Sequence, residues 1–295
     1  MSAPARDPSF GLFLIPGAAE YPDLLRQVAA AERGGLDLVG IQDHPYQRRH
    51  LDTFALIGDL LARTERLRFF PDVANLPLRP PAGLAKLAAS LDTMSSGRFE
   101  LGIGAGAFWD GVAAMGGPRR APGESVEALE EAIEIIRRFW SGERSISYEG
   151  RHYQVTGLHP GPPPAHEIGI WIGAYKPRML DLTGRLADGW VPSLGGAAPD
   201  AVPEMAKRIE EGAARAGRDP SAIRRLYNVK GRIAGGPAGD LLHGPPDHWI
   251  ETLTGFVLEL GFDSFLFWPQ DDDVLAQIER FAQEVAPGVR EAVSG

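Results

Sequence analysis

The chain has 295 residues, of which 44% are hydrophobic, and its formal net charge at pH 7 is −9. This length and apolar content allow a large core and are typical of one α/β barrel domain over residues 1–295. The negative charge and the lack of a Lys/Arg run argue against a nucleic-acid partner, and the absence of cysteine excludes disulfides and thiolate chemistry.

The beginning of the chain lacks a basic stretch followed by an apolar core, and no apolar run reaches the roughly 18 residues needed to span a bilayer. We therefore expect a cytoplasmic protein with no membrane partner. A homodimer is compatible with the apolar helix faces, although no segment specifies an interface.

Short apolar runs alternate with segments of helical period along the first half of the chain. The runs predict strands at Phe10–Ile15, Leu36–Gln42, Leu67–Asp72 and Phe99–Ile103. The periodic segments predict helices at Tyr21–Arg33, Asp52–Arg63, Pro81–Met94 and Glu124–Trp140.

Residues 142–166 interrupt this alternation. Ile146, Tyr148, Tyr153 and Val155 indicate a hairpin around Glu149-Gly150, and a proline-rich run from Pro160 to Pro164 follows it. We interpret the segment as an insertion after the fourth strand and as a candidate lid or wall of a binding site.

The alternation then resumes. Strands are predicted at Ile168–Ile172, Trp190–Pro192, Leu226–Ile233 and Phe262–Trp268, with helices beginning near Pro177, Pro199, Pro246 and Asp271. The complete chain thus holds about eight strand–helix repeats, which predicts a single (β/α)8 TIM barrel in the α/β class.

Three alternating glycines, Gly102, Gly104 and Gly106, end the fourth predicted strand. Gly102, Gly104 and Ala107 satisfy a loose Rossmann fingerprint, but that motif normally sits on the first strand–helix turn and opens its helix directly. Here the motif comes fourth, and Phe108–Gly111 precedes any helical period. The sequence therefore favours a barrel strand beneath a flavin, where glycines allow a flat ring to approach the backbone.

Functional residues of a parallel barrel gather where its strands end. The predicted strand ends are Gln42–His44, Asp72–Asn75, Gly104–Gly106, Gly173–Lys176, Pro192–Ser193 and Trp268–Gln270. They hold one histidine, two carboxylates, glycines and aromatic side chains, and they include neither a serine elbow nor a pair of histidines at metal-binding spacing. Such a set suggests that an organic cofactor supplies the chemistry.

The chain resembles the luciferase-like flavin-dependent oxidoreductases, and most of all the branch that uses the deazaflavin F420. The segments that carry the resemblance, in the family's order, are Gln42–Tyr46, Leu78–Lys86, Leu91–Arg98, the glycine strand, Leu186–Trp190 and Gly261–Asp263. The resemblance implies F420 as cofactor and hydride exchange with a small organic substrate. FMN with oxygen in a monooxygenase, and a flavin-binding protein without turnover, are the alternatives.

The resemblance also implies roles for individual residues. His44 would exchange a proton near the redox-active carbon, a task that suits an imidazole near neutral pH, and Asp43 would lie near the ring or its tail. The alternative for His44 is a hydrogen bond that caps its loop. The Asp72–Val73 peptide would form a cis bulge behind the ring, and Asn75 on the same strand end belongs to the expected cofactor-binding set.

The remaining expected contacts involve the ring flanks and the phosphate. Gly104, Gly106 and Asp110 would flank the ring and its ribityl chain. Gly173, Ala174, Tyr175 and Lys176 would offer backbone N–H groups and an ammonium to the phosphate, with an idle surface lysine as the alternative for Lys176. Some deazaflavin dehydrogenases carry an acid directly after the glycines; Ala107-Phe108-Trp109 stands here and indicates a more apolar substrate pocket.

Two other groups of residues receive structural interpretations. Arg98 precedes a strand, so we expect it to anchor the end of the barrel opposite the site. Asp271, Asp272 and Asp273 resemble a metal cluster, but carboxylates at a helix start are favoured by capping and by the helix dipole.

Overall fold

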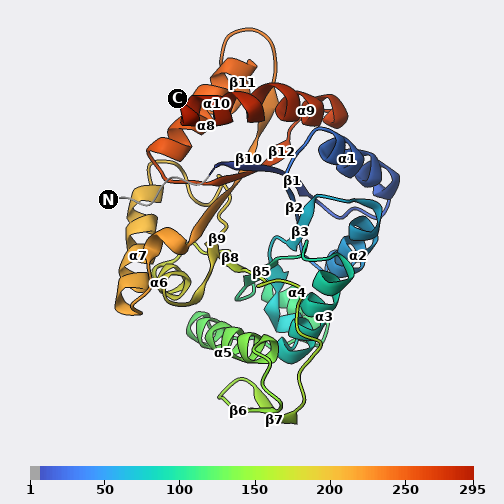
Figure 1. Cartoon of the computed structure of the whole chain (residues 1–295), viewed down its shortest axis with the longest axis vertical. Helices are drawn as coiled ribbons and strands as arrows, with labels where there is room; N and C mark the ends of the chain where they lie inside the picture. Colours follow the sequence, from blue (N-terminus) through green and yellow to red (C-terminus); the bar gives the residue numbers. More distant parts are fainter. Residues whose placement is uncertain (1–6) are drawn as a thin grey trace.

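A computed structural model describes residues 7–295, and its strands surround a common centre with helices outside them (Figure 1). One sheet has the order β3-β2-β1-β12-β10-β9-β8-β5-β4, with β11 added beside β10. The strands are β1 Ser9–Leu14, β2 Leu38–Ile41, β3 Arg68–Pro71, β4 Ala74–Asn75, β5 Leu101–Gly104, β8 Ile170–Ile172, β9 Gly189–Trp190, β10 Arg224–Ile233, β11 His243–Gly244 and β12 Ser264–Pro269.

The sheet closes on itself. β1 pairs in parallel with both β2 and β12, and a parallel bridge between Phe69 and Phe99 joins β3 to the residues leading into β5. β4 continues β3 after Asp72-Val73 and pairs with β5. The predicted (β/α)8 barrel is confirmed, with its eight strands found as β1, β2, β3 with β4, β5, β8, β9, β10 and β12.

Helices follow the strands as expected, with differences at their ends. They are α1 Tyr21–Arg33, α2 Thr53–Arg63, α3 Pro81–Met94, α4 Trp109–Ala114, α5 Pro122–Trp140, α6 Pro177–Leu186, α7 Val202–Arg215, α8 Pro246–Leu258, α9 Val274–Arg280 and α10 Ala286–Ser294. The helix expected near Pro199 begins at Val202. The sequence did not predict α4, because its six residues are too few to display a helical period.

The helix expected near Asp271 begins at Val274, and its capping explains the acidic run. The Asp273 carboxylate accepts a hydrogen bond from the Ala276 N–H, and Asp271 pairs with Arg232 at 2.6 Å. Within residues 7–295, no group of side chains has the arrangement of a metal site. Asp273 thus has the capping role that the sequence predicted for this run.

Apolar side chains fill two regions of the barrel. A large cluster lies between the sheet and the helices, and a smaller one lies inside the sheet. The inner apolar cluster consists of Phe13, Leu38, Phe70, Trp171, Val191, Leu226 and Leu266. It plugs the barrel, so the interior below the strand ends is filled by side chains.

The inserted segment forms the predicted hairpin from β6 Ile146–Glu149 and β7 Gln154–Leu158. Glu131 of α5 accepts hydrogen bonds from the backbone N–H groups of residues 151–153, and the His166 ring bonds Asp92 at the end of α3. These contacts hold the segment against the outer helices (Figure 1).

Arg98 anchors the end of the barrel opposite the strand tips, as expected. Its guanidinium donates to the carbonyls of Leu61, Leu67 and Ser95. Across residues 7–295, no helix is both long enough and apolar enough to cross a membrane.

Candidate active site

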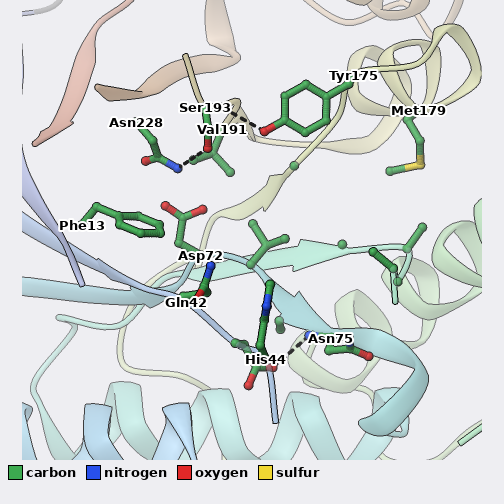
Figure 2. Close-up of a pocket in the computed structure, with 18 of the residues that line it drawn as sticks. Phe13, Gln42, His44, Asp72, Asn75, Tyr175, Met179, Val191, Ser193 and Asn228 are labelled. Atoms are coloured by element: carbon green, nitrogen blue, oxygen red, sulfur yellow. Dashed lines mark hydrogen bonds between the residues drawn. The ribbon is translucent and has the colours of Figure 1, made fainter. Parts of the chain in front are cut away.

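A cavity of about 450 Å³ opens at the carboxyl ends of the strands (Figure 2). Most of the residues singled out from the sequence line it, namely Asp43, His44, Asp72, Val73, Asn75, Gly104, Gly106, Gly173, Tyr175 and Lys176. Parallel strands bring these distant segments to one edge, which is why the strand-end argument located them.

Two of the expected residues do not line the cavity. Asp110 lies on α4 with 94% of its side chain exposed, and it forms an ion pair with Arg119. The expectation that Asp110 flanks a ring is therefore wrong, because α4 directs it to solvent. Ala174 is fully enclosed, and its carbonyl accepts a hydrogen bond from the Trp190 indole instead of facing the cavity.

The inserted segment is also absent from the cavity lining. No residue of 142–166 is among the lining residues, so the expectation of a lid or wall is wrong. The hydrogen bonds to Glu131 and Asp92 explain this result, because they fix the segment on the helical outer layer.

The backbone of the site centres on Val73. The Asp72–Val73 peptide is cis, as the resemblance implied. A side chain at Gly104 would lie 2.8 Å from a methyl of Val73, and one at Gly173 would lie 3.2 Å from it. These glycines therefore make room for the Val73 side chain rather than for a ligand directly. We call Val73 with Gly104 and Gly173 the apolar shelf.

Asp43 lies at the side of the cavity with its charge fully paired. It is 1% exposed, and its carboxylate accepts two hydrogen bonds from Arg79, at 2.8 and 3.0 Å, and one from the Asn75 N–H at 2.9 Å. Arg79 also binds Asp52, the N-cap of α2, at 2.9 Å. Asp43 thus ties the loop after β2 to the loop after β4.

The His44 imidazole is half-buried at the cavity and has no hydrogen-bond partner within residues 7–295. Its ring lies 5.5 Å from the Tyr46 ring and 5.4 Å from the Phe108 ring, centroid to centroid. Burial, followed by repulsion from His50, lowers the pKa of His44, so the imidazole is neutral at pH 7. The loop-capping alternative has no support here, since the ring caps nothing.

An anion-binding corner lies across the cavity. Gly173, Tyr175 and Lys176 come directly before α6, and Lys176 is exposed at the N-cap position. Burial and then Asp43 raise the pKa of Tyr46 to about 12, so its phenol carries no charge at pH 7. Among the lining residues of the described chain, Lys176 is the only lysine or arginine. The free N–H groups of a helix start and an ammonium suit a phosphate.

One polar residue that the strand-end argument missed, Asn228, lies deeper in the cavity. Asn228 is in the middle of β10, and its amide donates to the Ser193 hydroxyl at 3.1 Å (Figure 2). Asp72 lies beside it, with one carboxylate oxygen enclosed and unbonded. The alternation of Leu226 and Asn228 on one face of β10 is the signal that could have located Asn228.

The apolar part of the lining differs from the expectation. Phe108 and Trp109 do not line the cavity, and Phe108 is 62% exposed beside His44 and Tyr46. Apolar walls come instead from Phe13, Val73, Val191, Met179 and Trp268. Ala107 also lines the cavity, at the position directly after the glycines where some deazaflavin dehydrogenases carry an acid.

A sequence profile of the luciferase-like monooxygenase family matches residues 9–231. The chain belongs to this family. Among its relatives, an F420-dependent glucose-6-phosphate dehydrogenase of Gordonia bronchialis is 30% identical over 218 residues, which are 70% of this chain. That match spans only 63% of the relative's own length.

Other members of the luciferase-like family match over more of their length. An enzyme of the same name from Beutenbergia cavernae is 26% identical over 316 residues, covering 91% of this chain and 93% of the relative. A solved F420-dependent secondary alcohol dehydrogenase, in complex with an F420-acetone adduct, superposes with a TM-score of 0.86 and 20% identity over 96% of this chain and 99% of its own. The predicted family and its barrel fold are confirmed.

Proposed function

We propose that this protein transfers a hydride between F420 and the hydroxyl or carbonyl carbon of a small, mostly apolar substrate, with His44 moving the accompanying proton. The observation that carries the proposal is the His44 imidazole, which faces the cavity, is neutral at pH 7 and has no partner in the described chain. A neutral imidazole can accept the substrate hydroxyl proton without first breaking a hydrogen bond, and the imidazolium so formed can return that proton in the reverse direction.

The residues present fit the cofactor. The apolar shelf offers a surface for a flat ring, and Lys176 with the start of α6 offers a positive site for the phosphate. When bound, F420 supplies a ring carbon that takes or gives a hydride and reacts poorly with oxygen. The names of the relatives from Gordonia bronchialis and Beutenbergia cavernae support this cofactor over FMN.

The remaining residues have positioning roles in this proposal. Arg79 holds Asp43, and Asp43 holds the loop that carries His44. Phe108 and Tyr46 pack against the imidazole and limit the access of water. The walls of Phe13, Val191 and Trp268 favour an apolar substrate body.

Titration of the purified protein with F420 and with FMN, followed by fluorescence, tests the cofactor. F420 is expected to saturate the protein at the lower concentration. Tighter binding of FMN, together with oxygen uptake when the flavin is reduced, would replace this proposal with a monooxygenase.

The exchange of His44 for glutamine tests the proton step. His44→Gln is expected to slow hydride transfer by about 100-fold or more while F420 affinity stays within a few-fold, because the amide cannot carry a proton. Stopped-flow absorbance with F420 and a panel of alcohols gives the rate, and His243→Gln, an exposed site, is the control. Equal rates for both variants would remove His44 from the mechanism.

A further inference from the structure

Three polar side chains meet at the bottom of the cavity, where it touches the inner apolar cluster. They are Asp72, Ser193 and Asn228, and we call them the floor cluster. A side chain added at Gly40 would collide with Phe70, Leu266 and an Asp72 oxygen at 2.7 to 2.9 Å. The Asp72 carboxyl therefore rests directly on the apolar plug of the barrel.

The floor cluster is incompletely hydrogen-bonded. Asn228 donates its amide to the Ser193 hydroxyl, while its own Oδ1 and the Asp72 Oδ2 are buried without partners. Figure 2 shows the Asp72 carboxyl and the Asn228 amide pointing toward each other. The Asn228 side chain interacts with the Asp72 carboxyl and holds it in place, but Oδ2 receives no donor, so a proton on the carboxyl stays available for a further acceptor in the cavity.

The charged surroundings do not supply a counter-ion. The titratable groups that neighbouring elements bring to the cavity are Asp43, His44, Tyr46, Tyr175 and Lys176, and Lys230 of β10 lies over the Trp268 ring. Asp43 is bound by Arg79, and neither Lys176 nor Lys230 forms an ion pair with Asp72 in the described chain. Burial raises the pKa of Asp72 to about 7, against a smaller opposite effect of its interaction with the Asn228 side chain.

We infer that the floor cluster is a second binding subsite, in which Asp72 must hold its proton for the cavity to accept an uncharged carbonyl or hydroxyl oxygen of a ligand. The neutral carboxyl donates to such an oxygen, and Asn228 keeps the carboxyl in place. The ionised carboxylate can only accept, and it repels phosphate and carboxylate groups. The subsite thus selects a neutral ligand group at the floor.

Two sources can supply that oxygen, the edge of the cofactor ring or the substrate. This inference deepens the proposed function. It rests on that proposal only in the choice of F420 as the first ligand tested. Ligand affinity is expected to fall above pH 7 in either case, because binding then requires a proton to return to Asp72.

The experiment measures F420 affinity by fluorescence from pH 6 to pH 9 for the unchanged protein and for Asp72→Asn. The ionisations of F420 itself are common to both proteins, so the difference between the two curves reports Asp72. That difference is expected to reach about 100-fold at pH 9, one factor of ten for each pH unit above about 7. Asp272→Asn, an exposed aspartate, should follow the unchanged protein.

A second titration uses acetone as a carbonyl probe in the presence of saturating F420. If F420 affinity differs with pH between the unchanged protein and Asp72→Asn, the floor cluster binds the cofactor ring. If only acetone affinity shows this difference, the floor cluster binds the substrate. Identical curves for both ligands in the unchanged protein and in Asp72→Asn would overturn the subsite.

The design separates this inference from the cofactor assignment. If FMN binds in place of F420 and shows the Asp72-dependent loss, the subsite stands and the proposed cofactor falls. If Asp72→Asn does not fold, Asn228→Leu removes the side chain that holds the Asp72 carboxyl in place and is expected to weaken the same ligand about tenfold at pH 6. Unchanged binding in Asn228→Leu would also overturn the subsite.

Discussion

Asp43 and Asp72 follow neighbouring buried strands and line the same cavity, yet they are in opposite electrostatic states. Asp43 receives three hydrogen bonds from Arg79 and Asn75, whereas Asp72 receives none to its enclosed oxygen. The pair teaches that a carboxylate at a strand end has no fixed role. Its partners decide whether it is a structural anchor or a group that titrates near neutral pH.

The largest effect is expected from removing the Asp43 carboxylate, which Arg79 and Asn75 hold by hydrogen bonds. Asp43→Ala should lower the free energy of unfolding by about 3–5 kcal/mol, because it leaves a mostly buried Arg79 charge without its main partner. Urea denaturation at pH 7 measures the change.

Asp23→Ala is the matched control for Asp43→Ala. Asp23 pairs with Arg26 on the exposed face of α1, and its loss should change the free energy of unfolding by no more than about 0.5 kcal/mol. Similar values for the two variants would show that the Asp43 pair contributes no more than a surface pair.

The unpaired acid should behave in the opposite way. Its pKa is raised to about 7 in the folded protein, so ionisation opposes folding, and this cost grows from about pH 4 to pH 7 and is constant above. Asp72→Asn should therefore stabilise the protein by at most about 4 kcal/mol at pH 8 and have little effect at pH 4. Denaturation at both pH values tests this, and a pH-independent effect would contradict it.

The smallest effect is expected at Asp52, the second carboxylate that binds Arg79. Asp52 caps α2 through the N–H groups of Phe54 and Ala55 and also binds Arg79. Asp52→Ala should cost about 1 kcal/mol, chiefly through the lost cap. Thermal unfolding measures the change in stability. Asp52→Asn is the control and is expected to retain most of the cap. A loss of stability in Asp52→Ala as large as that in Asp43→Ala would make Asp52 the principal partner of Arg79.

The barrel could be predicted from the sequence because the same pattern of strand followed by helix repeats along the chain. Each buried strand is a short apolar run, and each covering helix carries an apolar stripe, as in Glu124–Trp140, which lies within α5. The lid expectation for 142–166 failed because the carboxylates of Glu131 and Asp92 accept hydrogen bonds from the backbone of the segment and so determine where it packs. Contacts between residues so distant in the chain leave no local pattern.

The site could be predicted only in part. Residues at strand ends were located by topology, but the ion pair of Asp43 with Arg79 joins positions 36 apart in sequence. The strand-end argument did not predict Asn228 as a site residue, because β10 has ten residues and continues past the cavity. The isolation of Asp72 is likewise a property of the packed interior, where the surrounding Phe70, Leu266 and Gly40 determine which partners are within reach.

The pairing of β1 with β12 has a consequence for synthesis of the chain. β1 and β10 each need β12 as a neighbour, and β12 ends at Pro269. Until the ribosome releases that segment, the nascent sheet has two open edges with unsatisfied backbone groups, the kind of surface that chaperones cover and that aggregation exploits.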